Sequence, residues 1–251
     1  MKVSVILPAA GLGTRMARPT SPNPATPAQS LEKRKQFLML DGTPVLIHTI
    51  RKFLHCPSVS EIIVALRPED IAWVQNLINK LEPTKPVRLT EGGDSRQASV
   101  QNALAILAPD TELVAVHDAV RPFIEPELVE NVIAEAARTG AAIVGIVPVD
   151  TVKQVHKHSV RSTLQREHLI LTQTPQVFHV ALLREAFAQA EADGFVGTDE
   201  SSLVERLDKV EVSVVAGSHR NIKITKPADL DLAKLYLHEE SQREVIQGAA
   251  H

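Results

Sequence analysis

The sequence predicts an α/β protein built on a doubly wound, mostly parallel β-sheet. Short, nearly continuous apolar runs alternate along the chain with amphipathic stretches, as they do in sheets that helices cover on both faces. Proline also stands at the expected first turn of several helices, where its missing N–H costs nothing. The length of 251 residues suits one large domain of this class.

The expected strands and helices follow one another in the order β-α-β-α-β. Strands are expected at residues 2–7, 61–66, 87–90, 112–117, 141–147 and 210–216. Helices are expected to start at the prolines of Thr43-Pro44, Arg67-Pro68, Glu125-Pro126 and Lys226-Pro227. The third helix keeps helical spacing of apolar residues from Leu128 to Ala136 and ends at Gly140. In such sheets ligands bind at the carboxyl ends of the strands.

Residues 1–238 are expected to form a single domain. Two segments within it interrupt the alternation of strands and helices. Residues 17–34 contain four prolines among Ser, Thr and Asn, which predicts a mobile loop. Residues 149–172 are polar and less periodic, which predicts an arm projecting from the domain. Residues 239–251 are expected to form a flexible tail.

The composition excludes several classes of protein. A formal net charge of −3 argues against a general nucleic-acid binder, although a local basic patch can still hold a small anion. Cys56 is the single cysteine, so an internal disulfide is impossible and a buried structural thiol is expected. The apolar N-terminal run is too short for a signal peptide or a membrane span and stops at Pro8. A cytoplasmic protein that binds no membrane is expected.

A loop of small residues, 8–16, follows the first expected strand. Gly11 and Gly13 let backbone N–H groups approach an anion, and Arg15 adds a positive charge. The loop is not the dinucleotide fingerprint, because Met16 occupies the third glycine position, and it lacks the Lys of a Walker loop. A tight turn without a ligand is the alternative for a Gly-x-Gly loop alone.

Two further loops follow strands. Gly92-Gly93-Asp94-Ser95-Arg96 leads into a helix that carries Ser99, and a turn capped by Asp94 or Ser95 explains it as well as a ligand does. His117-Asp118-Ala119-Val120-Arg121-Pro122 places a carboxylate where it suits a hard cation such as Mg²⁺. Arg121 can clamp a phosphate; the alternative is an internal Asp118–Arg121 ion pair, and His117 is expected to be a packed histidine.

Four more polar segments stand out: 150–153, 174–176, 198–200 and 221–225. Thr198 can serve as a helix N-cap, a ligand contact, or both. Lys223 lies between apolar neighbours in a strand-like pattern, so its side chain faces either solvent or an active site. The run Lys33-Arg34-Lys35 is typical of a solvated loop, although its place after the glycine loop also suits a phosphate-binding lysine.

In this order the segments closely resemble the 2-C-methyl-D-erythritol 4-phosphate cytidylyltransferases of the non-mevalonate isoprenoid pathway. The resemblance covers residues 3 to about 237. Its matching segments are 9–15, 35–37 (Lys-Gln-Phe), 92–96, 117–122, 174–176 (Thr-Pro-Gln), 198–200 (Thr-Asp-Glu) and 221–223 (Asn-Ile-Lys).

The resemblance implies a Rossmann-like nucleotidyltransferase fold, a homodimer formed through the 149–172 arm, CTP as donor and Mg²⁺ as cofactor. It implies a nucleotide site at Ala9, Ala10, Gly11, Gly13, Gly93, Asp94, Ser99 and Ala119. It implies that Arg15, Lys35 and Lys223 are catalytic, that Asp118 binds the metal, and that Arg121, Thr151, Arg166, Thr174 and Thr198 hold a polyol phosphate. Thr151 and Arg166 are expected to act in the neighbouring subunit's site.

Two departures from the family pattern are visible. The loop at 17–34 is longer than the family usually has. Arg220 stands where relatives often have an acidic residue, which leaves open whether a second carboxylate lies near the expected metal site.

The expected reaction is in-line attack by the acceptor phosphate on the α-phosphorus of CTP, with release of pyrophosphate. A phosphate monoester is largely dianionic at neutral pH, because its second pKa is about 6, so no general base is required. The alternatives are a ribitol 5-phosphate cytidylyltransferase, a non-catalytic CTP-binding regulator and, against the broken glycine fingerprint, an NAD-dependent oxidoreductase.

Overall fold

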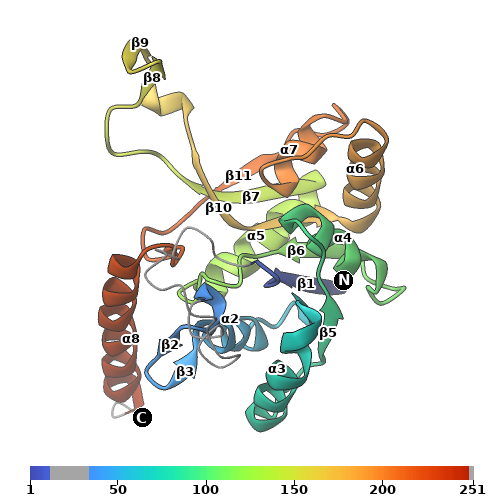
Figure 1. Cartoon of the computed structure of the whole chain (residues 1–251), viewed down its shortest axis with the longest axis vertical. Coiled ribbons are helices and arrows are strands. Elements are labelled where there is room, and N and C mark those ends of the chain that lie inside the picture. Colours follow the sequence, from blue (N-terminus) through green and yellow to red (C-terminus); the bar gives the residue numbers. More distant parts are fainter. Residues whose placement is uncertain (12–33, 249–251) are drawn as a thin grey trace, which may run out of the picture.

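The computed structural model describes residues 1–11 and 34–248 and is built around a seven-stranded sheet (Figure 1). The strands are β1 (Val3–Pro8), β4 (Val59–Leu66), β5 (Val87–Glu91), β6 (Leu113–Val116), β7 (Ala141–Ile146), β10 (Leu171–His179) and β11 (Ser213–Ala216). Their order is β11-β7-β10-β6-β1-β4-β5. Among the described strands of this sheet, β10 alone runs antiparallel to its neighbours, β6 and β7. The predicted doubly wound, mostly parallel sheet is therefore confirmed.

Each of the six predicted strands is present, with ends that coincide with the predicted ones or shift by up to three residues. The seventh, β10, was not predicted, because its polar Thr174-Pro175-Gln176 segment does not have the apolar pattern of a central strand. These residues are nevertheless buried, and Thr174 and Gln176 both use their side chains in hydrogen bonds. The strand register shifts between Thr172 and Gln176, where the Thr174–Pro175 peptide bond is cis.

The helices are α2 (Val45–Leu54), α3 (Pro68–Leu81), α4 (Arg96–Ala105), α5 (Pro126–Thr139), α6 (Val180–Ala192), α7 (Glu200–Glu205) and α8 (Pro227–Gly248). Proline occupies the first turn of α3, α5 and α8, as predicted. Gly140 ends α5 with a φ of 94°, a conformation that glycine adopts without strain. Pro44 instead precedes α2, as its N-cap.

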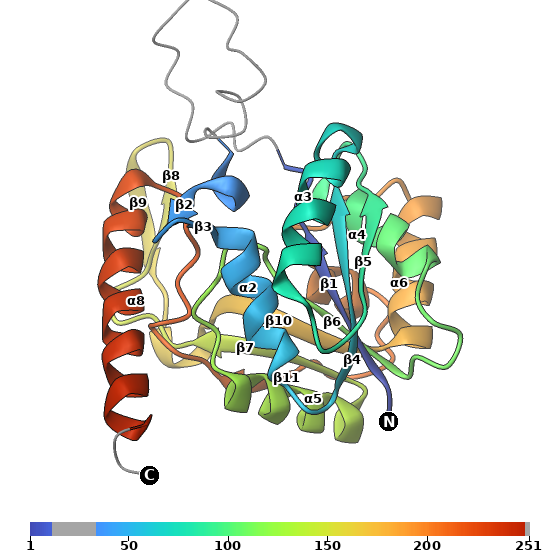
Figure 2. The ribbon, with the colours of Figure 1, turned by 90° about the horizontal axis from the view of Figure 1, so that it is seen from below.

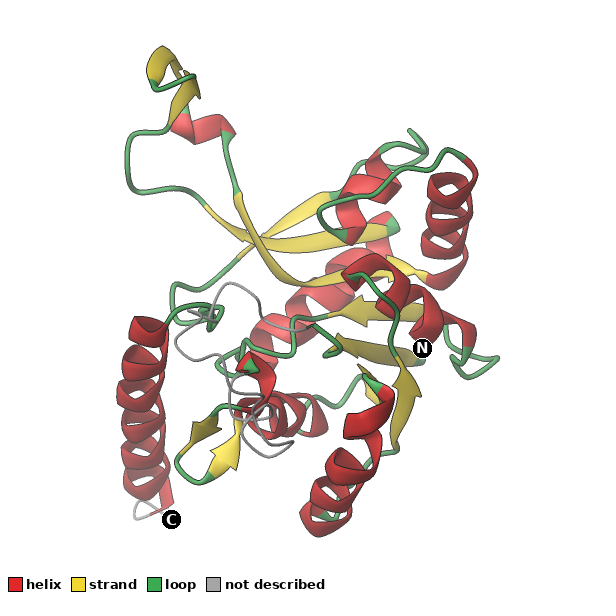
Figure 3. Ribbon diagram, viewed as in Figure 1, coloured by secondary structure: helices red, strands yellow, loops and turns green. Residues whose placement is uncertain are grey.

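Helices cover both faces of the sheet because neighbouring strand residues point in opposite directions. Val5 and Val64 pack on the side of α2, α3 and α5. Ile6 and Ile63 pack on the side of α4, α6 and α7. Figures 2 and 3 show the strands between these two helical layers. The long helix α8 packs through a third, smaller apolar cluster that includes Ala233.

The arm leaves the domain beyond β7 (Figure 1). It consists of β8 (Lys153–His156) and β9 (Ser159–Thr163), which pair antiparallel, and the short helix η2 (Arg166–His168). Every residue of β8 and β9 is exposed. A projecting arm within 149–172 is therefore present as predicted.

The expected tail from residue 239 is wrong over most of its length, because α8 continues to Gly248. Two acidic side chains tie this part of the helix to the domain: Glu239 binds Arg220 at 2.6 Å, and Glu240 binds Lys52 at 2.9 Å. Arg220 also stacks on Tyr236 of α8. Within the described residues, no helix is both long and apolar enough to cross a membrane.

The structure also has short elements before α2. These are the helix η1 (Lys35–Phe37) and the strands β2 (Met39–Leu40) and β3 (Thr43–Pro44). The loop predicted at 17–34 lies outside the described residues except for Arg34.

Candidate active site

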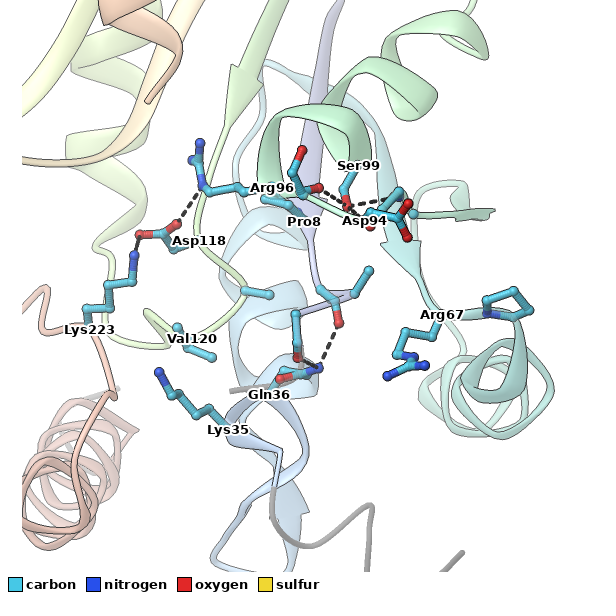
Figure 4. A pocket seen from close by; sticks show the side chains of 18 residues that line it. Pro8, Lys35, Gln36, Arg67, Asp94, Arg96, Ser99, Asp118, Val120 and Lys223 are labelled. Atoms are coloured by element: carbon cyan, nitrogen blue, oxygen red, sulfur yellow. Dashed lines mark hydrogen bonds and ion pairs between the residues drawn. The ribbon is translucent and has the colours of Figure 1, made fainter. Parts of the chain in front are cut away.

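A cavity of about 590 Å³ lies at the carboxyl ends of β1, β4, β5 and β6 (Figure 4). From β1 the chain connects outward to β4 and β5 on one side, whereas β6 lies on the other side. The cavity thus occupies the switch point where ligands bind in doubly wound sheets. It is lined by Pro8, Ala9, Ala10, Gly11, Lys35, Gln36, Arg67, Pro68, Gly92, Gly93, Asp94, Ser95, Arg96, Ser99, Asp118, Ala119, Val120 and Lys223.

One end of the cavity is built mainly from backbone. The Gly92 N–H donates to the Leu66 carbonyl at 2.6 Å, which joins this loop to the end of β4, and Gly92 also lies against Ala10 of the loop after β1. A Cβ on Gly92 would lie 2.4 Å from the Ala10 Cβ, so this close approach requires glycine. Ser99 then fixes the loop, because its hydroxyl accepts the Gly93 N–H and donates to the Ser95 carbonyl. Of the two predicted N-caps of α4, Ser95 is the one observed.

Lys35 reaches the cavity from η1, which is firmly attached to the domain. Gln36 donates to the carbonyls of Ala9 and Gly11 at 2.7 and 3.1 Å, which joins η1 to the loop after β1. Arg34 forms a two-pronged ion pair with Asp70 of α3 at 2.5 and 2.6 Å.

Arg34, Lys35 and Asp70 are all buried. The prediction of a solvated loop is therefore wrong for Arg34 and Lys35, because these cations have partners in the fold. Lys33 lies outside the described residues.

Asp118 stands at the other end of the cavity, surrounded by three cations. Its carboxylate lies 2.9 Å from Lys223 Nζ, 3.2 Å from Arg121 Nε and 3.4 Å from Arg96 Nε. Burial would raise the pKa of Asp118, but Arg96, Lys223 and Arg121 outweigh burial and hold that pKa well below its ordinary value. Asp118 is therefore a permanent anion, and Figure 4 shows it between Arg96 and Lys223.

The residues around Asp118 are held by a buried polar network. The Thr174 hydroxyl accepts the Asp118 N–H at 3.0 Å. Arg121 donates to the Asn221 carbonyl at 2.7 Å, and Asn221 donates to the Thr174 carbonyl at 2.9 Å. This network fixes the segment 221–225 that carries Lys223. That segment is irregular, contrary to its strand-like pattern.

His117 is a packed histidine, as predicted. It is fully buried, stacks edge-on against Phe53 and hydrogen-bonds to the Arg121 carbonyl and the Thr174 hydroxyl. Burial lowers the pKa of His117 to about 4, so its ring is neutral near pH 7.

The predicted substrate residues are not all at the cavity. Ala9, Ala10, Gly11, Lys35, Gly93, Asp94, Ser99, Asp118, Ala119 and Lys223 line it. Arg121 and Thr174 lie buried beneath Asp118, and the Asp118–Arg121 ion pair considered from the sequence is present. Thr151, Arg166 and Thr198 are exposed and do not line the cavity. Gly13 and Arg15 lie outside the described residues.

Several residues at or behind the cavity were not among the predicted site residues. Arg96, Gln36 and Arg67 line it, and Glu200 binds Arg96 from behind at 2.6 Å. Arg96, Gln36 and Glu200 fall, respectively, within the segments 92–96, 35–37 and 198–200 that the sequence singles out. A charged or amide side chain inside each such segment was the available signal. Asp199, and not Thr198, is the N-cap of α7.

Mg²⁺ can be tested against this donor set. Mg²⁺ commonly binds one or two carboxylates together with substrate phosphates and water. Asp118 supplies one buried carboxylate, and the described residues contain no cluster of three His, Cys, Asp or Glu side chains that could hold a metal alone. Arg220, the departure noted in the sequence, binds Glu239 and is not among the cavity residues. The residues therefore fit a Mg²⁺ ion that takes most of its ligands from a bound nucleotide.

Fold and cavity define the class of protein: a nucleotidyltransferase of Rossmann-like architecture, with a backbone-lined loop at one end of its site and a cluster of cations at the other. The family model of 2-C-methyl-D-erythritol 4-phosphate cytidylyltransferase (IspD) matches residues 3–239. The chain therefore belongs to this family.

The chain is similar to curated relatives and to solved structures over nearly its whole length. The chain is 57% identical to the 2-C-methyl-D-erythritol 4-phosphate cytidylyltransferase of Solibacter usitatus, over 98% of this chain and 100% of the relative. It is 52% identical to that of Acidobacterium capsulatum, over 97% and 100%. The crystal structure of the Thermus thermophilus enzyme of that name superposes with a TM-score of 0.72 at 34% identity, over 94% of this chain and 98% of the other. The 4-diphosphocytidyl-2C-methyl-D-erythritol synthase of Anaerococcus prevotii gives 0.79 at 30% identity, over the same shares.

Proposed function

We propose that this protein transfers CMP from CTP to the phosphate of 2-C-methyl-D-erythritol 4-phosphate, in the biosynthesis of isoprenoid precursors. The products are 4-diphosphocytidyl-2-C-methyl-D-erythritol and pyrophosphate. The observation that carries the proposal is buried Asp118 among Arg96, Arg121 and Lys223, with Lys35 lining the same cavity, at the switch point of a chain of this family. Such a cluster suits the joining of two polyanions.

The acceptor phosphate is its own nucleophile, because it is dianionic at neutral pH. One of its oxygens attacks the α-phosphorus of CTP, and the bond to the β-phosphate oxygen breaks to release pyrophosphate. The site then needs positioning and positive charge more than a base. The neutral, buried His117 agrees with this requirement, since both of its ring nitrogens contact other protein groups.

Each cation has a distinct role in this scheme. Lys35 neutralises the triphosphate and the departing pyrophosphate, together with Arg15 from the loop outside the described residues. Lys223, whose side chain is 39% exposed, leaves its contact with Asp118 to bind the α-phosphate and the acceptor phosphate. Asp118 would hold Mg²⁺, which, when bound, withdraws electron density from the phosphates.

The opposite end of the cavity is proposed to bind the nucleoside. Ala9, Ala10, Gly93, Asp94 and Ser99 would surround the cytosine, with Gly11 and Ala119 near the ribose. Backbone groups held by Gly92 and Ser99 give fixed donors and acceptors for the base edge.

The polyol phosphate contacts suggest a homodimer. Thr151 and Arg166 belong to the arm and do not line the cavity of their own chain. Isolated two-stranded hairpins are marginal in water, and β8 and β9 expose Val155 and Val160 by 63% and 61%. We infer that the arm packs on a second copy and brings Thr151 and Arg166 to the second copy's cavity.

The dimer has its own test. Val155→Glu, which places a charge on the arm, should shift the sedimentation mass from dimer to monomer. Lys157→Gln at the tip of the arm is the control, because it makes the net charge more negative by the same one charge, and a monomeric wild type would rule the dimer out.

The remaining substrate residues have narrower roles. Thr198 lies before α7 and is proposed to contact the polyol of the acceptor. Arg121 and Thr174 are proposed to act from beneath the site, by holding Asp118 and the Lys223 segment.

The direct test of the proposed function is pyrophosphate release with CTP and Mg²⁺ and a panel of acceptors. Release is expected with 2-C-methyl-D-erythritol 4-phosphate and not with ribitol 5-phosphate or without acceptor. Release with ribitol 5-phosphate alone would move the protein to another pathway. CTP binding without release from any acceptor would leave a regulator.

A further inference from the structure

Arg96 bridges two buried carboxylates at the edge of the cavity. Its Nη1 donates to Glu200 Oε1 at 2.6 Å, and its Nε lies 3.4 Å from Asp118 Oδ1. The Glu200 and Asp118 side chains are only 2% and 9% exposed, whereas that of Arg96 is 30% exposed. Arg96 is thus held from behind by Glu200, which is not itself among the cavity residues.

A contribution to stability does not by itself explain why a buried carboxylate stands at position 200. Its second oxygen, Oε2, is buried and has no hydrogen-bond partner in the described part of the chain. A buried ion pair is weak evidence for stability, because removing two charges from water costs about as much as their attraction returns. A buried carboxylate with one unsatisfied oxygen therefore needs a reason beyond packing.

Glu200 is placed by a rigid local frame. Asp199 caps α7 by accepting the Ser202 N–H at 3.1 Å. Gln176, buried in β10, donates to the Asp199 carboxylate at 2.8 Å and accepts the Ser201 N–H at 3.0 Å. The first turn of α7 is therefore joined to the central sheet on both sides of Glu200, which leaves its carboxylate little freedom to follow Arg96 if Arg96 moved.

The guanidinium of Arg96 has one side left for a ligand. Nε and Nη1 face Asp118 and Glu200, and Nη2 has no hydrogen-bond partner among residues 1–11 and 34–248. Arg96 also lies on the opposite side of Asp118 from Lys223 in Figure 4. A planar guanidinium fixed at two corners presents its remaining donors in one direction, which suits a phosphate oxygen.

We propose that Arg96 contacts a phosphate group of the bound substrates beside Asp118, and that Glu200 is the positioning residue that fixes the direction of the Arg96 guanidinium. The inference rests on the proposed function, because it takes the anionic ligand of this cavity to be the reacting phosphates. It goes beyond the family resemblance, which assigned no role to either residue.

The test uses Glu200→Gln, Arg96→Lys and the double variant in the full chain. Glu200→Gln keeps the shape and removes the charge that orients Arg96. Arg96→Lys keeps a positive charge, but a single ammonium group cannot bind both carboxylates and also donate to a substrate phosphate. Each single variant is expected to lower kcat about 10- to 100-fold, as misplacement of a positioning group does. Affinity for CTP, measured by calorimetry, should change less than about threefold, because the nucleoside end of the cavity is untouched.

Two comparisons separate positioning from a loss of folding. Glu61→Gln is the matched control, since Glu61 is also buried and pairs with Arg88 at 3.2 Å, outside the cavity. It is expected to retain wild-type kcat. The double variant should be no slower than the slower single variant, because both substitutions break the same unit.

Three results would overturn the proposal: wild-type kcat in Glu200→Gln, losses that multiply in the double variant, or an equal loss of kcat in Glu61→Gln. If Glu200→Gln does not fold, Arg96→Lys decides, and wild-type kcat in that variant refutes the phosphate contact. An inactive wild-type protein would instead refute the proposed function, so the two failures are distinguishable.

Discussion

Lys223→Met removes the cation that the proposed mechanism places on the reacting phosphates. Methionine keeps most of the length and apolar stem of lysine and deletes only the charged end. In the structure, Lys223 Nζ lies 2.9 Å from Asp118, and its side chain is 39% exposed. The substitution therefore separates the catalytic role of Lys223 from its structural role.

The expected size of each effect follows from the surroundings of Asp118. Asp118 keeps two other cations, Arg96 and Arg121, so its charge is not left alone. A partly exposed ion pair contributes about 0–1 kcal/mol to stability, which lowers Tm by no more than about 4 °C in a chain of this size. Loss of one preorganised donor to transition-state charge costs about 10²- to 10³-fold in kcat, or roughly 3–4 kcal/mol.

The assay is steady-state pyrophosphate release at saturating CTP and acceptor, with Tm measured on the same preparation. Lys226→Met is the control, since Lys226 is an exposed lysine three residues away that is not among the cavity residues. Its kcat should equal that of the wild type. A Lys223→Met enzyme with kcat within about threefold of wild type would refute the role of Lys223. A fall in Tm much larger than predicted would mean that Lys223 acts through the fold.

Three further predictions concern groups around the site and in the core. Asp70→Asn should lower the free energy of unfolding in urea by about 3–5 kcal/mol, because it leaves buried Arg34 without its ionic partner. It should also raise the KM for CTP, because Lys35 follows Arg34 directly in the chain. Unchanged stability would contradict the role given to the Arg34–Asp70 ion pair. The His117 pKa of about 4 lies below the unfolded value, so stability should fall by roughly 2.5 kcal/mol from this group between pH 7 and 4.5. In His117→Gln the free energy of unfolding should fall by that much less between pH 7 and 4.5. The same pH dependence in the variant and the wild type would refute the lowered pKa of His117. Burial raises the pKa of Cys56 to about 12, so iodoacetamide at alkaline pH should alkylate it only after unfolding.

The sequence was sufficient where one physical rule decides the structure. Strands buried on both faces must be apolar, so β1, β4 and β6 were predictable from composition alone. The proline starts of α3 and α5 and the glycine end of α5 were equally clear. Because the ligand site of such a sheet lies beyond its strand ends, Asp118 and Gly93 were placed correctly at the cavity.

The sequence did not predict the local structure of segments that are held by residues far away in the chain. Nothing local shows that Thr174 and Gln176 lie in a central strand, because their hydrogen-bond partners Asp118 and Asp199 are far away in the sequence. The helical course of residues 239–248 has a similar cause, since Glu240 pairs with Lys52.

The same limit applies to the charges at the site. Arg34 and Lys35 resemble a solvated run until Asp70 and the cavity are placed beside them. The link of Glu200 to the cavity is visible only when Arg96, with which it pairs, is seen to reach Asp118.

The most direct test of the central claim follows the phosphorus atoms by ³¹P NMR, with wild-type protein, CTP, Mg²⁺ and 2-C-methyl-D-erythritol 4-phosphate. Transfer of CMP predicts a product with two mutually coupled phosphorus resonances, formed in equal amount with pyrophosphate while the acceptor's monoester resonance disappears. Formation of CMP and pyrophosphate with the acceptor unchanged would show hydrolysis instead. Unchanged CTP and acceptor, with folded protein, would contradict the account.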